Sequence, residues 1–356
     1  MIGSGSERMK REISASLVAL AACTAGAFLC QWLHTPLPWM IGPLFVMAIL
    51  SLAEVHAVAP PGGRQIGQVI IATALGLYFT PTVAREVITY GHVLIAAAVL
   101  AIGLAYGGAF FVARYANIDR TTAFFASVPG GAAEMAVLGE RFGGKVDRIV
   151  VAQSLRILLV VVVVPFSMVL LGVHGVDAYE PANVPVQIEG LAILLAISAV
   201  TSFVFAWLNL PNAFMLGSLC ATIALTVSEI QLSSMPTLLS NAGQLLIGCA
   251  LGSRFDRSFM RSARRFIVVV CASVVLAMIL SALLGAGLAM LASLVVPSMV
   301  LATAPGGIAE MCITAKVLQL GVPLVTAAHV TRVIVLVTMT GPLFRFVRRM
   351  ARRKTP

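Results

Sequence analysis

Two short phrases of the chain combine helix-breaking residues with a carboxylate inside apolar sequence. PGGAAEM spans Pro129–Met135, and PGGIAEM spans Pro305–Met311, 176 positions later. Proline and glycine at membrane depth are tolerated where the freed backbone lines a cavity enclosed by protein. A carboxylate at that depth is costly and marks a functional site by default. The two copies predict two halves of one structure that meet around one site.

Each phrase predicts a half-helix that begins just after its glycines. The free N–H groups and the positive dipole end at such a terminus suit a small anion or the carboxylate of an organic acid. We therefore predict a substrate site at the loop glycines, which are Gly130, Gly131, Gly306 and Gly307. Glu134 and Glu310 are candidates for coupling a proton or cation, because a buried carboxylate can change protonation near neutral pH. The alternative role is a structural ion pair with an arginine.

An arginine follows each glutamate after 22 residues, within a long apolar run. These residues are Arg156 and Arg332. One role is bidentate binding of a substrate carboxylate, and the other is to anchor the broken segment to the next helix. The halves differ three residues earlier, where Gln153 matches His329. His329 is a candidate coupling group because histidine titrates near neutral pH; the alternative is a hydrogen-bonded packing residue.

The repeat extends beyond these phrases. GQVIIATALG at 67–76 matches GQLLIGCALG at 243–252, again 176 positions later, and Leu37-Pro38 matches Leu210-Pro211. Gln68 and Gln244 stand at the same place in both halves, where each either bridges helices or contacts a ligand. The repeated glycines favour close helix packing. Internal duplication with interrupted apolar segments at matching positions is typical of secondary transporters.

Composition identifies an integral membrane protein. The 356 residues are 60% hydrophobic and 11% charged, with a mean hydropathy of +1.00, whereas a soluble domain has about 25% charged residues. The six cysteines are scattered singly and read as apolar filler rather than disulfides or metal ligands. The apolar run after Arg11 continues to about Trp32, which is long enough to span and is not a cleavable signal.

The elements that must position these residues are predicted to be all α-helical. We expect about ten spans, five in each half, plus the interrupted segments 121–140 and 297–319. The predicted spans are 13–33, 37–53, 65–80, 91–113, 149–172, 187–208, 211–228, 240–254, 266–291 and 323–344. The division of the chain is a cytoplasmic N-terminus (1–12), a first repeat (13–172), an acidic periplasmic connector (173–186), a second repeat (187–344) and a basic cytoplasmic tail (345–356).

Charge decides whether each interrupted segment crosses the bilayer or re-enters it. Crossing would place the arginines at 254–265 outside, against the positive-inside rule. Re-entry makes the two halves inverted repeats, puts both termini and nearly all basic residues in the cytoplasm, and leaves Arg85 outside with the acidic Asp177, Glu180 and Glu189. The basic flanks then face anionic lipid of a bacterial inner membrane. No soluble domain is present to enter a nucleic-acid groove, so nucleic acid is not an expected partner.

The duplicated PGGxxEM phrase, the GQxxIxxALG stretch and the closing VTAAHVTRV run resemble the bacterial membrane AbrB family over about 15–345. The resemblance implies two "AbrB duplication" halves and a likeness to inverted-repeat carriers with re-entrant hairpins. Members are often given the provisional labels of ammonia monooxygenase or AbrB-type regulator. The five histidines fall on separate segments without the clustering that copper or iron requires, so no enzyme activity and no cofactor are expected.

Three functions stay open at this stage. The first is a secondary transporter that moves a small organic anion by alternating access, coupled to H⁺ or Na⁺. The second is a membrane-embedded regulator or sensor that affects gene expression indirectly, and the third is a cation/proton exchanger. The expected partners are a small-molecule substrate and the lipid bilayer. Carriers of this type are often homodimers, although no residue of the sequence decides the oligomeric state.

Overall fold

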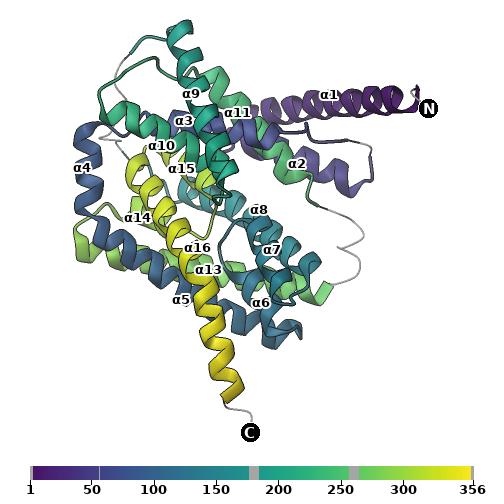
Figure 1. Ribbon diagram of the computed structural model, residues 1–356, viewed down its shortest axis with the longest axis vertical. Helices are drawn as coiled ribbons and strands as arrows, with labels where there is room; N and C mark the ends of the chain where they lie inside the picture. The colour runs from purple at the N-terminus through teal and green to yellow at the C-terminus, as the bar shows by residue number, and fades with distance from the viewer. Residues whose placement is uncertain (1–2, 56, 176–183, 256–263, 354–356) are drawn as a thin grey trace.

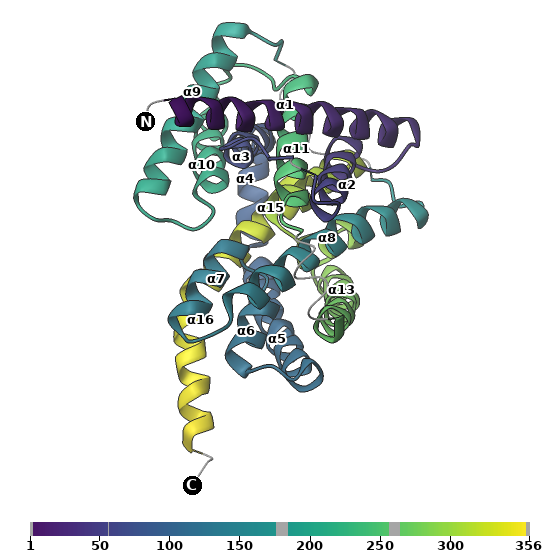
Figure 2. The same cartoon turned by 90° about the vertical axis from the view of Figure 1, so that its right-hand side faces the viewer.

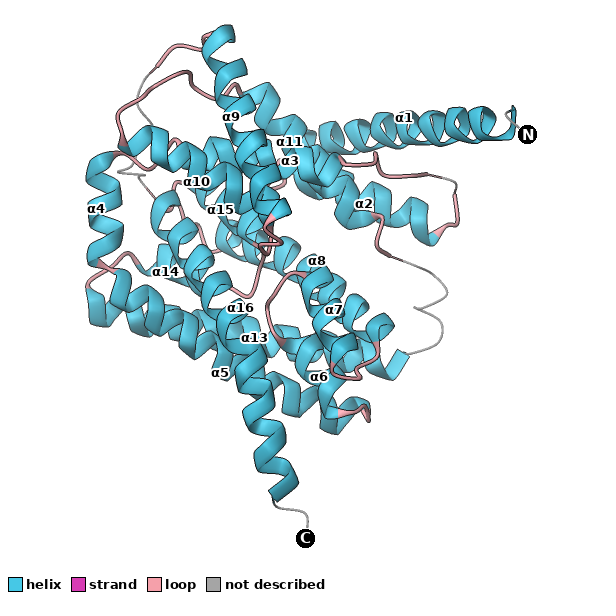
Figure 3. Cartoon of the chain, in the orientation of Figure 1, coloured by secondary structure: helices cyan, strands magenta, loops and turns pink. Residues whose placement is uncertain are grey.

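The computed structural model describes residues 3–55, 57–175, 184–255 and 264–353. Within these ranges the chain is helical and contains no strand (Figure 3). Asp177 and Glu180 of the predicted connector, and Arg257 and Arg261 of the predicted cytoplasmic cluster, lie outside the described residues.

The helices of the two halves follow the same order. The first half contains α1 (Gly3–Trp32), α2 (Pro38–Leu52), α3 (Gly63–Gly76), α4 (Pro81–Thr89), α5 (Gly91–Ala116), α6 (Arg120–Ser127), α7 (Ala132–Arg141) and α8 (Val146–Leu170). The second half contains α9 (Ile188–Trp207), α10 (Ala213–Val227), α11 (Thr237–Gly252), α13 (Arg264–Ala292), α14 (Val296–Thr303), α15 (Ile308–Leu318) and α16 (Val322–Arg353). Each of the ten predicted spans is a helix, and each predicted interrupted segment is two short helices.

Fewer of these helices than predicted are long enough to cross a bilayer alone. Among the described residues five qualify by length and composition, namely residues 12–32 of α1, and α5, α8, α9 and α13. A sixth span arises if α3 and α4, which meet at 92°, are counted as one. The helices α2, α3, α10 and α11 have 14 to 16 residues, or about 21–24 Å, which is shorter than the roughly 30 Å hydrocarbon core. The sequence-based count of ten depended on apolar composition, which does not fix helix length.

The duplication is visible in the backbone itself. Left-handed φ angles recur at matching non-glycine positions, with φ of 52° at His34 and 55° at Asn209, and 59° at Glu54 and 60° at Glu229. Leu37 (φ 53°) and Asn212 (φ 50°) each precede a short apolar helix, α2 or α10. The structural partner of Asn212 is therefore Leu37, so the sequence-based match of Leu37-Pro38 with Leu210-Pro211 was wrong by two residues.

The helices pack as two units, each built from both halves (Figures 1 and 2). One unit consists of α1, α2, α3, α9, α10 and α11; we name it the crossing unit because α3 and α11 cross each other within it. The other, which we name the hairpin unit, consists of α5–α8 and α13–α16. Helix α4 contacts α10 of the first unit and α5 and α16 of the second. Because α3 packs on α10 and α11 on α2, neither half of the sequence forms a unit alone.

Each interrupted segment lies in the hairpin unit and packs on the helix that follows it, α8 or α16. The backbone N–H of Lys145, at the start of α8, donates to Thr122 Oγ1, near the start of α6, over 2.8 Å. The chain therefore turns back at the first PGG loop. The end of the second hairpin lies at the other end of α8, where the N–H of Gly175 donates to the carbonyl of Leu318 over 3.0 Å. The two hairpins thus have their bases at opposite ends of α8.

The repeated glycines allow close helix packing, as the sequence predicted. Helices α3 and α11 run antiparallel and approach at Gly67 and Gly243, where a Cβ on Gly67 would lie 2.6 Å from the carbonyl oxygen of Gly243. A Cβ on Gly76 would lie 2.6 Å from Thr222 of α10, and one on Gly252 would overlap the backbone of α2.

We expect Gly67→Ala to lower the melting temperature in detergent, because the added methyl meets backbone that cannot move aside. Overpacking of this kind costs about 1–3 kcal/mol. Gly107→Ala on α5 is the matched control, since a Cβ there has no atom within 4 Å and alanine favours the helix. Equal melting temperatures for the two variants would contradict the close approach of α3 and α11.

Candidate functional site

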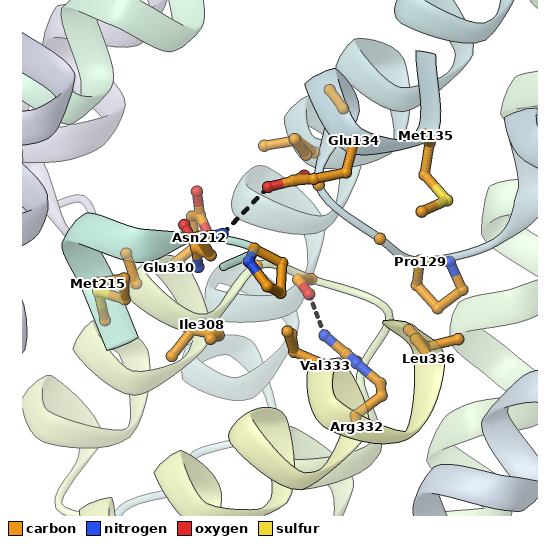
Figure 4. A pocket seen from close by; sticks show the side chains of 18 of the residues that line it. Pro129, Glu134, Met135, Asn212, Met215, Ile308, Glu310, Arg332, Val333 and Leu336 are labelled. Atoms are coloured by element: carbon orange, nitrogen blue, oxygen red, sulfur yellow. Dashed lines mark hydrogen bonds between the residues drawn. The ribbon is translucent and has the colours of Figure 1, made fainter. Parts of the chain in front are cut away.

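The two PGG loops meet at a central cavity between the hairpin unit and the crossing unit (Figure 4). The hairpin unit contributes both loops, Glu134, Glu310, Arg156 and Arg332, while the crossing unit contributes residues of α3, α10 and α11. The structure thus brings together the four predicted glycines, both glutamates and both arginines. Loops that start 176 residues apart in sequence line one site, as the duplication predicted.

Each arginine holds the loop of its own hairpin. Arg156 donates from Nη1 to the carbonyl of Val128 over 2.9 Å and from Nη2 to that of Gly130 over 3.1 Å. Arg332 donates to the matching carbonyls of Ala304, over 2.5 Å, and Gly306. These carbonyls follow the last turn of α6 or α14 and have no helical partner. The arginines are 5% and 3% exposed, so their planar forks satisfy broken backbone in a buried place.

Gln153 and His329 do the same task with different chemistry. Gln153 donates from Nε2 to the carbonyl of Phe125 over 2.7 Å. His329 Nε2 lies 3.0 Å from the carbonyl of Leu301, the matching residue, which requires the imidazole proton on Nε2. Both side chains are fully buried. His329 is not among the residues that line the central cavity, so the geometry supports its packing role, and its candidacy as a coupling group stays a prediction.

The two glycines of each loop leave space that other side chains of the same motif occupy. A Cβ on Gly131 or Gly307 would overlap the carboxylate of Glu134 or Glu310, which folds back over the start of its own helix. A Cβ on Gly130 would lie 2.7 Å from Met135. Each carboxylate therefore lies at the positive dipole end that the sequence assigned to a substrate anion. The guanidinium Nη atoms bind loop carbonyls rather than these glutamates.

One polar chain joins the two units across the cavity. Glu134 Oε1 accepts from the backbone N–H of Asn212 over 3.1 Å (Figure 4). The Asn212 side chain accepts from Gln68 Nε2 over 3.0 Å. Gln68 therefore bridges α3 to the entry of α10 and also lines the cavity, while contact of Gln68 with a ligand stays a prediction. Gln244 does not reach this cavity and lines a second one.

The sequence did not single out Asn212 or Arg64 as site residues. Asn212 adopts φ 50° before α10, a conformation that asparagine tolerates better than most residues, and this is the signal that could have found it. Arg64, in the first turn of α3, lines the cavity, although the sequence-based topology counted it only as a cytoplasmic flank.

Size and charge limit what the cavity can hold. Its volume is about 70 Å³, which is room for a few waters. Three arginines and two glutamates line it, for a formal charge of +1. The cavity therefore accommodates a molecule of a few heavy atoms, and its positive excess favours an anion.

A family model described as "Transition state regulatory protein AbrB" matches residues 39–348, which is most of the chain. The chain belongs to the AbrB family. Both PGG loops and both arginines lie within the matched range. The site is therefore part of the region that defines the chain as an AbrB-family membrane protein.

Two relatives match nearly the whole chain. One is "Uncharacterized protein YhjN" of Bacillus subtilis (strain 168), 26% identical over 92% of this chain and 92% of its own length. The other is named "Putative regulator AbrB", from Escherichia coli (strain K12), 24% identical over 90% of this chain and 93% of its own. Neither name assigns a substrate. Among the described residues, no three histidine, cysteine or acidic side chains gather as metal ligands.

We expect His329→Gln to preserve the fold and His329→Leu to destabilise it. Glutamine supplies the same donor in the other half, whereas leucine removes the donor and leaves the carbonyl of Leu301 with only the bond from the Ala304 N–H, at a cost of about 0.5–1.5 kcal/mol. Melting temperatures of the two variants in detergent check this. Gln153→His and Gln153→Leu form the matched pair in the first half. A drop of equal size for His329→Gln and His329→Leu would contradict the shared role.

Proposed function

We propose that this AbrB-family protein is a secondary transporter that moves a small organic anion by alternating access, coupled to H⁺ or Na⁺. The observation that carries this proposal is the central cavity, where one PGG loop from each half meets the crossing unit. A site at the interface of internal repeats, formed by broken helices, is the recurring arrangement of secondary transporters.

An inverted arrangement of the halves in a bacterial inner membrane is part of the proposal. The hairpin bases at opposite ends of α8 support re-entry from opposite sides. Basic residues gather at the end that holds the first hairpin base, since Arg265 donates to the carbonyl of Tyr115 and Arg148 lies over the ring of Phe266. The positive-inside rule makes that end cytoplasmic.

Each arginine uses both Nη atoms to hold its loop and keeps one donor, Nε, that the loop carbonyls do not use. Nε of Arg156 and Nε of Arg332 are buried and have no hydrogen-bond partner among the described residues. Arg64 adds a half-buried guanidinium at the same cavity. Together with the N-termini of α7 and α15, these groups supply positive charge for a carboxylate.

In this proposal Glu134 and Glu310 act as internal competitors of the substrate. Each carboxylate lies over the glycine at the start of its half-helix, where a bound anion would also gain most. Protonation of the glutamate, or Na⁺ bound to it, removes the repulsion and lets the substrate approach. Substrate and coupling ion are thereby bound together, which is the requirement for symport.

The hairpin unit then moves against the crossing unit during transport. The contacts between the two units near the site are few, and one of them is the link from Glu134 to Asn212. Breaking that link when Glu134 is protonated would free the first hairpin from α10. The loops themselves travel intact, because each is held within its own unit by an arginine.

The names of the family and of one relative favour a regulatory role as the second candidate. A carrier of this kind can change gene expression by altering the concentration of the metabolite that it moves. The two readings differ in whether purified protein alone moves the anion across a lipid bilayer.

The first experiment measures the melting temperature of the detergent-purified protein with small carboxylates, amino acids and ammonium, each with and without sodium, at acidic and neutral pH. A ligand of the folded state raises the melting temperature by mass action. We expect one carboxylate to give a saturable shift that grows with sodium or at acidic pH, and to be taken up by proteoliposomes. A shift without uptake would favour the sensor, and a shift with cations alone the exchanger.

We expect Glu310→Gln to fold normally and to lose the dependence of uptake on its coupling ion. Glutamine is uncharged at every pH, so it imitates the protonated carboxyl group without exchanging a proton. Uptake by proteoliposomes over a pH series, with and without sodium, is the measurement. Unchanged dependence on pH and on sodium would remove Glu310 from the coupling role.

Gly307→Ala tests whether transport requires the position of the Glu310 carboxylate over Gly307. Its methyl overlaps the Glu310 carboxylate, which is flexible and can swing away, so we expect a small change in melting temperature and a large loss of uptake. Gly287→Ala on α13 is the control, because a Cβ there has no neighbour within 4 Å. Normal uptake by Gly307→Ala would show that the position of the carboxylate is not needed.

A further inference from the structure

A second cavity, of about 260 Å³, lies between α3, α11 and α15. Its apolar wall comes from α3 and from Ile313, and its polar wall consists of Ser240, Asn241 and Gln244 on α11 with Lys316 on α15. It shares no lining residue with the central cavity. The transport site described above therefore leaves this cavity unexplained.

The duplication relates the second cavity to the central one. Gln244 is the repeat partner of Gln68, and Ser240 is the partner of Arg64, at an offset of 176. Gln68 and Arg64 line the central cavity near the start of α3, while Gln244 and Ser240 line the second near the start of α11. Because α3 and α11 run antiparallel, the two cavities lie at opposite ends of this helix pair.

The second cavity presents donors without a lining carboxylate. Ser240 is 5% exposed, and its buried hydroxyl has no hydrogen-bond partner among the described residues. A buried hydroxyl without a partner costs free energy unless a ligand or water completes it. The Lys316 ammonium lies 5.9 Å from the ring centroid of Tyr78, and no ion pair to it is found within the described ranges. The amides of Asn241 and Gln244 add further donors.

Buried isoleucines separate the two cavities. Ile247, on α11 one turn beyond Gln244, lines the central cavity, and its repeat partner Ile71 lines the second. Ile71, Ile247 and Ile313 are 2–3% exposed. Gln244 and Ile247 are three residues apart, or about 4.5 Å along the helix, so the two cavities approach each other along α11.

We propose that the second cavity is an anion-binding vestibule, where Lys316, Ser240, Asn241 and Gln244 hold a small oxyanion or carboxylate at the end of the α3–α11 pair opposite to the central cavity, and that the two cavities are reached from opposite membrane faces. The role of this cavity as an entry or exit for substrate rests on the proposed transport function. Binding of an anion in the cavity does not depend on transport. In this proposal the charge comes from Lys316 in the second cavity and from arginines in the central one, so the two cavities bind the same class of anion through different residues.

Anion binding is tested by the melting temperature of the full-length protein titrated with sodium succinate, acetate or phosphate, with sodium chloride as the ionic-strength control. We expect Lys316→Gln to remove one saturable component and Lys316→Arg to retain it. Arg85→Gln on α4 is the control, because this exposed arginine lines neither cavity. An unchanged titration for Lys316→Gln, or an equal loss for Arg85→Gln, would overturn the site.

Sidedness is tested with the matched variants Gln68→Cys and Gln244→Cys. A membrane-impermeant sulfonate thiol reagent is added to right-side-out and to inverted vesicles, and the native protein gives the background. We expect each variant to react from one face only, the two faces to be opposite, and succinate or phosphate to slow the reaction at Gln244→Cys. Reaction of both from the same face would overturn the proposal. Neither assay requires transport, so absent uptake by the native protein would instead count against the carrier.

Discussion

The site depends on the hydrogen bonds that a buried arginine donates to the carbonyls of a broken helix. A loop such as Pro129–Gly131 leaves backbone oxygens without helical partners, and nothing in an apolar interior replaces those partners cheaply. Arg156 and Arg332 each supply two donors from one rigid group. The loop glycines, the seated glutamates and the cavity between the units all follow once the loops are fixed.

The PGGxxEM motif both packs its own side chains closely and compensates the charge at the start of its half-helix. The first glycine of each copy leaves room for the methionine, and the second leaves room for the glutamate. The carboxylate then compensates the positive end of its own helix. The glutamate carboxylate therefore already occupies the positive end of the helix, and an anion that binds there must compete with it.

The sequence predicted the all-helical class and the meeting of the loops, because a duplication at constant spacing places matching residues at matching positions. Equal spacing placed Gly130 with Gly306 and Glu134 with Glu310 before any coordinates, and one cavity contains them all. Hydrogen-bond partners were not predictable, since the spacing of 22 residues between Glu134 and Arg156 does not show that the arginine donates to the carbonyls of Val128 and Gly130. Asn212 was missed because its backbone conformation, rather than a repeated letter, places it against Glu134. The lengths of α2, α3, α10 and α11 also escaped, because apolar composition continues past helix ends.

The interlocking of the halves has a consequence for how the chain is made. The last turn of α3 is seated on α10, and α11 is seated on α2. When the ribosome has finished the first half, α2 and α3 still lack the surfaces against which they are shaped. The packing of α2 and α3 is therefore incomplete until α10 and α11 have been synthesised and inserted. Folding of the crossing unit therefore requires α9–α11 of the second half as well as α1–α3, and a fragment that ends after the first half would expose to lipid the glycines that α10 and α11 cover.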